Sequence, residues 1–163
     1  MNDISGKPAM GRLARAGILF IAQGAYTGRS PVAPGTAGTL LGVLVYAVAS
    51  GLSLVPYLLL CFALILLGTW AAGRAETILG GKDDSRIVID EVAGYLVAMI
   101  LIPSGWAFAV AGFFLFRFFD IVKPFPIYRM QRLKGGLGVM IDDLGAAVYT
   151  NIVLRIISWS VNG

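Results

Sequence analysis

Histidine is absent from this sequence of 163 residues, and cysteine occurs once, at Cys61. Without histidine the chain can form neither a Ser-His-Asp triad nor a phosphohistidine intermediate, which excludes the histidine-dependent membrane phosphatases. A single cysteine permits no disulfide framework and leaves a nitrogen-and-sulfur zinc site with too few donors. Cys61 is followed by "FALILL", so the chain has no Cys-x5-Arg phosphate loop.

Charge is also scarce. Charged residues make up 13% of the chain and hydrophobic residues 58%, whereas about a quarter of the residues in a soluble domain are charged. The mean hydropathy is +0.82, and no charged residue lies between Arg29 and Arg74. That interval can hold two membrane helices of about 20 residues with a turn at 50–56. We therefore predict one membrane-embedded domain covering residues 1–163.

The apolar runs predict an all-α bundle that crosses the membrane several times, with about five short transmembrane helices. The expected spans are 38–51, 55–73, 88–102, 104–122 and 143–161. An earlier segment, 16–22, is apolar but short and follows basic residues, and we expect it to form an interfacial or partly inserted helix rather than a signal peptide.

The third and fourth spans have an alternative, because the charge-free run from Val92 to Phe116 is short enough for one tilted helix. The sequence "IPSG" at 102–105 interrupts this run with turn residues and favours a hairpin of two helices. A hairpin brings Asp90 and Glu91 to the same side of the membrane as Asp120. A single helix would separate them by about 30 Å of hydrocarbon.

The basic residues support the hairpin. Lysine and arginine precede the first span, lie between the second and third, and lie between the fourth and fifth, while the turns at 51–55 and 103–105 contain neither. This is the positive-inside pattern of a chain with a cytoplasmic amino terminus. Arg155 is the exception, and we expect it to extend toward the outer interface.

Carboxylates gather at the expected cytoplasmic ends of the spans. Asp90 and Glu91 begin the third, Asp120 closes the fourth, and Asp142 and Asp143 begin the fifth. Acids at helix starts also favour the helix dipole, but Asp120 at a helix end opposes it. Acids at membrane depth are costly and usually functional. Carboxylates converging from three helices suit a hard cation such as Mg²⁺, held together with a substrate phosphate.

Groups that bind phosphate surround these acids. Arg117, Asp120 and Lys123 are spaced three apart and share one helix face. The glycines of "KGGLG", Gly135 and Gly136 among them, allow backbone amides to approach an anion, although such turns are also common without ligands. The loop at 27–42 offers the hydroxyls of Ser30, Thr36 and Thr39 either to a lipid phosphate or to the capping of the next helix.

Four blocks of sequence together resemble the phosphatidylglycerophosphatase A family. They are "SPVAPGTAGT" (30–39), "IVIDEVAG" (87–94), "FRFFDIVKPFPI" (116–127) and "GGLGVMIDDLGAAVYTN" (135–151). The resemblance implies a Mg²⁺-dependent phosphatase of the bacterial cytoplasmic (inner) membrane, with its active site facing the cytoplasm, that converts phosphatidylglycerol phosphate to phosphatidylglycerol. The implied partners are a phospholipid substrate and the membrane, with no nucleic acid.

The acidic positions of the family correspond here to Asp83, Asp90, Glu91, Asp120, Asp142 and Asp143, with Lys123 in the same set. We expect Asp90, Glu91, Asp120 and Asp143 to bind the metal, and Asp142, Lys123 and Arg117 to act in catalysis. The expected substrate-binding residues are Ser30, Thr36, Thr39, Asp83, Gly135 and Gly136.

Three questions stay open at the level of sequence. Direct attack by water and an aspartyl-phosphate intermediate are both compatible with these residues. Another phospholipid monoester, such as phosphatidate, would fit the same site. A cation transporter or a structural membrane subunit is the alternative to an enzyme, although transport sites usually lie at broken helices near the membrane midplane.

Overall fold

The computed structural model of the protein describes residues 11–82, 84–130, 133 and 135–162. Over these residues the chain is all-α, with seven α-helices, one 3₁₀ turn and no strand. The helices are α1 (Arg12–Ala22), α2 (Pro34–Ala49), α3 (Leu54–Leu79), α4 (Ile89–Ala98), α5 (Trp106–Val122), α6 (Ile127–Met130) and α7 (Gly136–Asn162). The predicted all-α class is confirmed, and a helix overlaps each of the five expected spans, although the bounds differ.

Local signals explain where several helices begin and end. Pro34 occupies the first turn of α2, where its missing N–H costs no hydrogen bond. Gly80 ends α3 in the left-handed conformation that glycine adopts without strain (φ 80°). The chain leaves α4 after Ala98 and re-enters a helix only at Trp106, so the interruption expected at 102–105 separates two helices.

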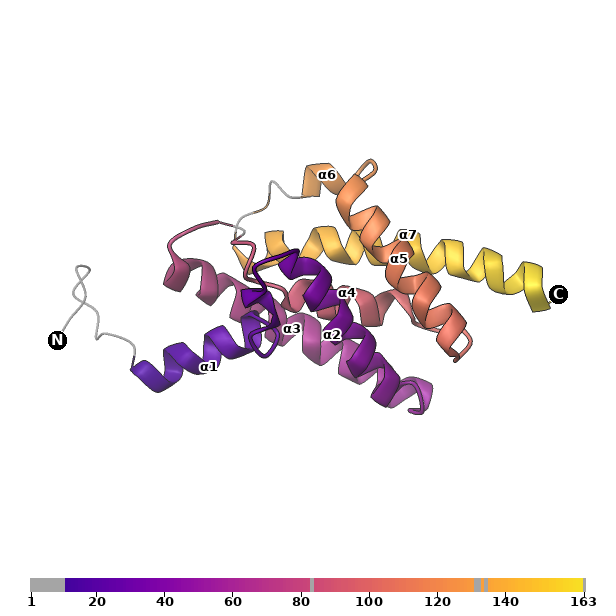
Figure 1. Ribbon diagram of the computed structural model, residues 1–163, viewed down its shortest axis with the longest axis horizontal. Helices are drawn as coiled ribbons and strands as arrows, with labels where there is room; N and C mark the ends of the chain where they lie inside the picture. Colours follow the sequence, from indigo (N-terminus) through magenta and orange to yellow (C-terminus); the bar gives the residue numbers. More distant parts are fainter. Residues whose placement is uncertain (1–10, 83, 131–132, 134, 163) are drawn as a thin grey trace.

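The central helix is α4, which contacts α2, α3, α5 and α7 (Figure 1). Eight of its ten residues are buried, Asp90 among them. The expected span 88–102 was too long: α4 is about 15 Å in length, half the thickness of a bilayer core. Tyr95 and Leu96 of α4 pack with Phe116 of α5 and Leu154 of α7 in the main apolar core.

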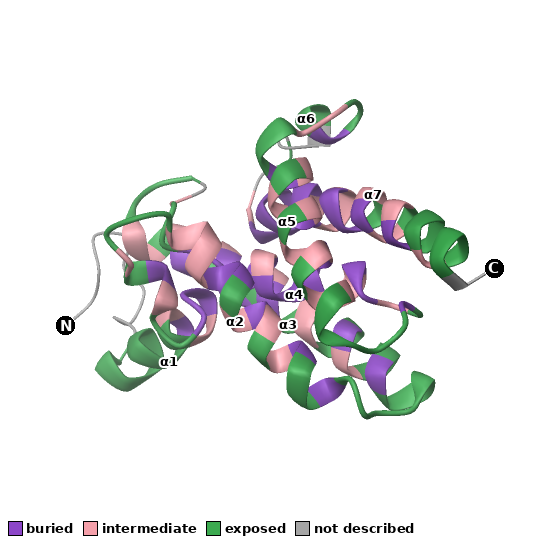
Figure 2. Ribbon diagram, turned by 45° about the vertical axis from the view of Figure 1, so that its right-hand side comes forward, coloured by how far each residue is buried: buried purple, intermediate pink, exposed green. Residues whose placement is uncertain are grey.

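Two described helices, α3 and the segment Gly136–Val161 of α7, are long and apolar enough to cross a membrane, and α2 is a shorter apolar helix. Large apolar side chains are exposed on the outside of the bundle, among them Val48, Trp106 and Trp159, and the far end of α7 is coloured as exposed in Figure 2. Soluble monomers rarely expose such an extensive apolar surface. The first helix, α1, packs against α3.

Candidate functional site

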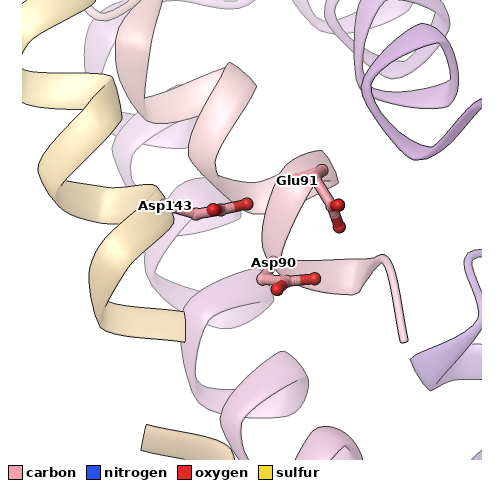
Figure 3. Close-up of side chains that lie close together, drawn as sticks. All are labelled: Asp90, Glu91 and Asp143. Atoms are coloured by element: carbon pink, nitrogen blue, oxygen red, sulfur yellow. The ribbon is translucent and has the colours of Figure 1, made fainter. Parts of the chain in front are cut away.

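Three carboxylates meet where the first turn of α4 faces α7. Asp90 and Glu91 come from α4 and Asp143 from α7, and each offers an oxygen within 4.8 Å of the others (Figure 3). Asp90 is 7% exposed and Asp143 only 3%. Gly94, one turn further along α4, lets the two helices come this close, because a Cβ there would lie 3.2 Å from Cβ of Asp143.

These carboxylates are incompletely partnered. One oxygen of each, namely Oδ1 of Asp90, Oε2 of Glu91 and Oδ2 of Asp143, is buried and accepts no hydrogen bond from the protein. Burying unpaired carboxylates together is costly unless a cation compensates their charge. An all-oxygen set of this kind suits a hard divalent cation, so the residues present fit a metal centre.

Asp120, the fourth predicted metal ligand, lies beside this group and is engaged by cations. Its carboxylate forms ion pairs with Nη1 of Arg117, at 2.8 Å, and with Nζ of Lys123, at 3.7 Å. Both contacts join residues three apart in the chain, as the spacing predicted; Arg117 and Asp120 lie on α5, and Lys123 directly follows its last residue. Asp120 also interacts with Asp143, which places it between the three carboxylates and the basic groups.

Arg117 connects three helices. Besides Asp120, it lies 3.9 Å from Oε1 of Glu91 on α4 and donates to the hydroxyl of Thr39 on α2 at 3.4 Å. Its Nε is buried and has no protein acceptor. A buried guanidinium N–H without a partner is a donor available to a phosphoryl oxygen.

Lys123 forms an ion pair with Asp142, which is buried in α7 next to Asp143. Burial lowers the pKa of Lys123, but the hydrogen bond and charge of Asp142, with the charges of Asp120 and Asp143, outweigh this effect and hold the pKa above its ordinary value. Lys123 therefore remains an ammonium group beside the acids at neutral pH.

Of the predicted substrate-binding residues, the structure links Thr39 to the carboxylates and places Ser30 and Gly135 in other contacts. Thr39 lies at the site through Arg117, and Thr36 is half-buried in the first turn of α2. The hydroxyl of Ser30 donates to the carbonyl of Val32. Gly135 lines a separate cavity of about 420 Å³ at the end of α3, together with Glu76 and Lys82. Asp83 lies outside the described residues.

Gly136 has a packing role that the sequence did not indicate. A Cβ at this position would overlap the carbonyl oxygen of Thr69 and lie 2.7 Å from the backbone nitrogen of Gly73, both on α3. The glycine therefore lets the start of α7 cross α3 in backbone contact.

Asp84, in the loop between α3 and α4, pairs with Arg86 at 2.7 Å, and this hydrogen bond lowers the pKa of Asp84.

Sequence reasoning missed the glycine that touches the site. A Cβ at Gly35, in the first turn of α2, would overlap Oε1 of Glu91 and lie 3.2 Å from Nη1 of Arg117. The only sequence signal is a glycine directly after the proline that starts the helix, and its partner in space is 56 positions away along the chain.

Comparison with known proteins gives consistent matches. Residues 20–158 match a family described as Phosphatidylglycerophosphatase A. A Haemophilus influenzae protein named Phosphatidylglycerophosphatase A is 40% identical over 148 residues, covering 87% of this chain and 89% of the relative. The Escherichia coli protein of the same name is 33% identical over 140 residues, covering 85% and 81%.

A third relative, from Bacteroides thetaiotaomicron, is 38% identical over 153 residues, covering 88% of this chain and 94% of the relative. Its name provisionally assigns it as a phosphatidylinositol-3-phosphatase. No solved structure gives a significant match.

Proposed function

This chain belongs to the phosphatidylglycerophosphatase A family, and from that premise we propose that it is a Mg²⁺-dependent phosphatase acting on phosphatidylglycerol phosphate. It is a phosphoric monoester hydrolase and releases the terminal phosphate to give phosphatidylglycerol. Because the family is a family of enzymes, the alternative functions considered from the sequence, a cation transporter and a structural membrane subunit, are not pursued. The observation that supports the metal dependence is the group of three carboxylates, each of which has one buried oxygen without a protein partner.

The charges at the site favour a divalent cation and an anionic substrate together. Five carboxylates and two cationic side chains lie in this region, the carboxylates being those of Asp90, Glu91, Asp120, Asp142 and Asp143. A divalent cation on the three carboxylates would offset most of the excess negative charge. The phosphate would then bind near that cation and near the basic groups of Arg117 on α5 and Lys123 just after it.

Each side chain has a defined part in the proposed reaction. Asp90, Glu91 and Asp143 would hold Mg²⁺, with Asp120 beside them bridging to Arg117 and Lys123. When bound, Mg²⁺ would supply neutralisation of phosphate oxygens and activation of a water molecule. The free Nε–H of Arg117 and the ammonium of Lys123 would donate to the phosphoryl oxygens as their charge develops.

Asp142 would act as the general base. It would accept the proton of the attacking water, and its ion pair with Lys123 orients it before the reaction. Water would form the new bond to phosphorus as the bond to the lipid oxygen breaks. An alternative with an aspartyl-phosphate intermediate uses the same residues, and trapping of a phosphorylated protein during turnover would distinguish it.

The relative from Bacteroides favours phosphatidylinositol 3-phosphate as a second candidate substrate. Both lipids present a phosphate monoester at the headgroup plane, and the residues proposed here would contact the phosphate rather than the rest of the headgroup. The two substrates, with phosphatidate as a third, are therefore to be compared directly.

We expect the protein, purified in detergent, to release phosphate from phosphatidylglycerol phosphate in the presence of Mg²⁺. Phosphate release should stop when a chelator is added. Asp143→Asn should lower kcat/KM by about 100-fold or more, because ligand loss exceeds the effect of outer-shell changes. Asp84→Asn is the matched control, since the same change there affects only a loop pair with Arg86. Activity that persists in chelator, or in Asp143→Asn, would contradict the metal-dependent mechanism.

A further inference from the structure

The short helix α4 ends inside the protein rather than at its surface. Ala98 is fully buried and Met99 is 2% exposed, so the last carbonyl groups of α4 face no water. Backbone amides of the following turn satisfy three of the last four carbonyls of α4, because the N–H of Met99 donates to Tyr95 and Leu96 and the N–H of Ile100 donates to Val97. The carbonyls of Ala98 and of Ile100, in the turn itself, accept from a side chain instead, and leaving them unpaired in an apolar interior would cost free energy.

Side chains of α7 supply these hydrogen bonds. The amide of Asn151 on α7 donates to the carbonyls of Ala98 and Ile100, both at 2.8 Å. Arg155, one turn further along α7, donates from Nε to Oδ1 of Asn151 at 2.7 Å and from Nη2 to Ile100 at 3.3 Å. The Arg155 contact fixes which end of the amide faces α4.

A separate donor comes from α3, where the hydroxyl of Tyr57 donates to the carbonyl of Leu96 at 2.7 Å. This bond also satisfies a carbonyl near the end of α4. It originates, however, on a helix that contributes none of the three grouped carboxylates.

The position of Asn151 matters for the opposite end of the same helix pair. Asp90 and Ala98 are eight positions apart on α4, and Asp143 and Asn151 are eight positions apart on α7. Both intervals correspond to about 12 Å along a helix axis. The two helices therefore run side by side in the same direction, joined at one end by the Asn151 amide and meeting at the other at the carboxylates.

We infer that Asn151 is a positioning residue for the metal centre: it holds α4 in register with α7, so that the oxygens of Asp90, Glu91 and Asp143 converge. Arg155 supports it by orienting the amide. The inference rests on the proposed metal function. A slip of one residue moves a helix by about 1.5 Å, whereas metal–ligand distances tolerate only about 0.2 Å, so a small loss of register is enough to open the site.

Binding of Mn²⁺ to the purified full-length protein in detergent tests this directly and needs no substrate. Asn151→Leu keeps the size of the side chain and removes the hydrogen bonds to the carbonyls of Ala98, at the end of α4, and of Ile100, in the turn after it. We expect its Kd for Mn²⁺ to rise by about tenfold or more, as for other residues that orient metal ligands. Arg155→Met, at an exposed position, should raise the Kd by about threefold because the amide of Asn151 remains but is no longer oriented.

Tyr57→Phe is the matched control. It also removes one hydrogen bond to the end of α4, but from α3, so it should lower thermal stability and leave the Kd for Mn²⁺ unchanged. Wild-type affinity in both Asn151→Leu and Arg155→Met would overturn the inference, as would equal weakening in Tyr57→Phe. If Asn151→Leu does not fold, the comparison of Arg155→Met with Tyr57→Phe decides. A wild-type protein that hydrolyses its substrate yet binds no Mn²⁺ would overturn the metal site itself, and this inference with it.

Discussion

The acids of the site differ in their partners, although they look alike in the sequence. Asp90 and Asp143 each keep a buried oxygen without a protein donor, whereas Asp120 is held by Arg117 and Lys123. The sequence placed all of these acids in one group because each lies at the end of an expected helix. Which acids face one another depends on the rotation and depth of three helices, and no local pattern encodes those quantities.

Gly35 has no side chain, and this leaves space for the carboxylate of Glu91. A Cβ at this position would overlap Oε1 of Glu91, the end of a flexible side chain that can rotate away. We therefore expect Gly35→Ala to cost little stability but to displace the carboxylate from the metal centre. The apparent Mg²⁺ requirement should rise and kcat/KM should fall by about tenfold, in the range of other changes that disturb metal ligands.

Gly17→Ala tests whether the effect belongs to this position. Gly17 lies within α1, and nothing lies within 4 Å of the added methyl group. Alanine there should leave activity unchanged and raise helix stability by up to about 1 kcal/mol. Equal activity in Gly35→Ala and Gly17→Ala would show that the contact with Glu91 is unimportant for the reaction.

At the scale of elements, the sequence predicted where helices occur more accurately than where they begin and end. The expected spans 55–73 and 143–161 correspond to α3 and α7, which continue for further turns at the end of the bundle that carries the acids. Hydropathy marks apolar residues and ends at the first charges, but a helix continues through polar residues as long as its backbone hydrogen bonds are kept. The reverse error occurred at α4, whose apolar sequence continues to Ile102 although the helix ends at Ala98.

The crossing of α3 and α7 depends on contact between the two backbones. At Gly136 a methyl group would meet the carbonyl of Thr69, which cannot move without its helix. We expect Gly136→Ala to destabilise the protein by about 1–3 kcal/mol, the usual cost of overpacking. For a chain of this size that lowers Tm by about 2–4 °C per kcal/mol, measurable by thermal unfolding in detergent.

Gly81→Ala serves as the comparison for this crossing. Gly81 lies in the loop after α3, and nothing lies within 4 Å of an added Cβ. The free energy of unfolding of Gly81→Ala should stay within about 0.5 kcal/mol of the wild-type value, as is usual for surface changes. A Gly136→Ala protein as stable as Gly81→Ala would mean that α7 can shift away from α3 at no cost.

At the scale of the whole molecule, the acids and two exposed tryptophans lie at opposite ends of the bundle. Trp106 begins α5 and Trp159 lies near the end of α7, and both are about 80% exposed, at 81% and 79%. Asp120 and Asp143 occupy the other ends of these two helices. Exposed tryptophan is typical of the membrane–water interface. Because tryptophan is enriched at both interfaces, these two residues mark only the end of the bundle opposite the acids. The cytoplasmic placement of the acids stays the prediction made from the basic loops.

Labelling of single cysteines with a membrane-impermeant maleimide tests this orientation, in a Cys61→Ala background. Gly51→Cys, in the turn between α2 and α3, should react in intact cells, because the basic loops predict that this turn faces outward. Lys82→Cys, in the loop before α4, should react only after the membrane is opened. The reverse pattern would place the acids outside the cell, and labelling of both in intact cells would contradict the multi-pass arrangement. The expected result puts the carboxylates, Arg117 and Lys123 at the cytoplasmic headgroup plane, where the phosphate of a lipid substrate lies.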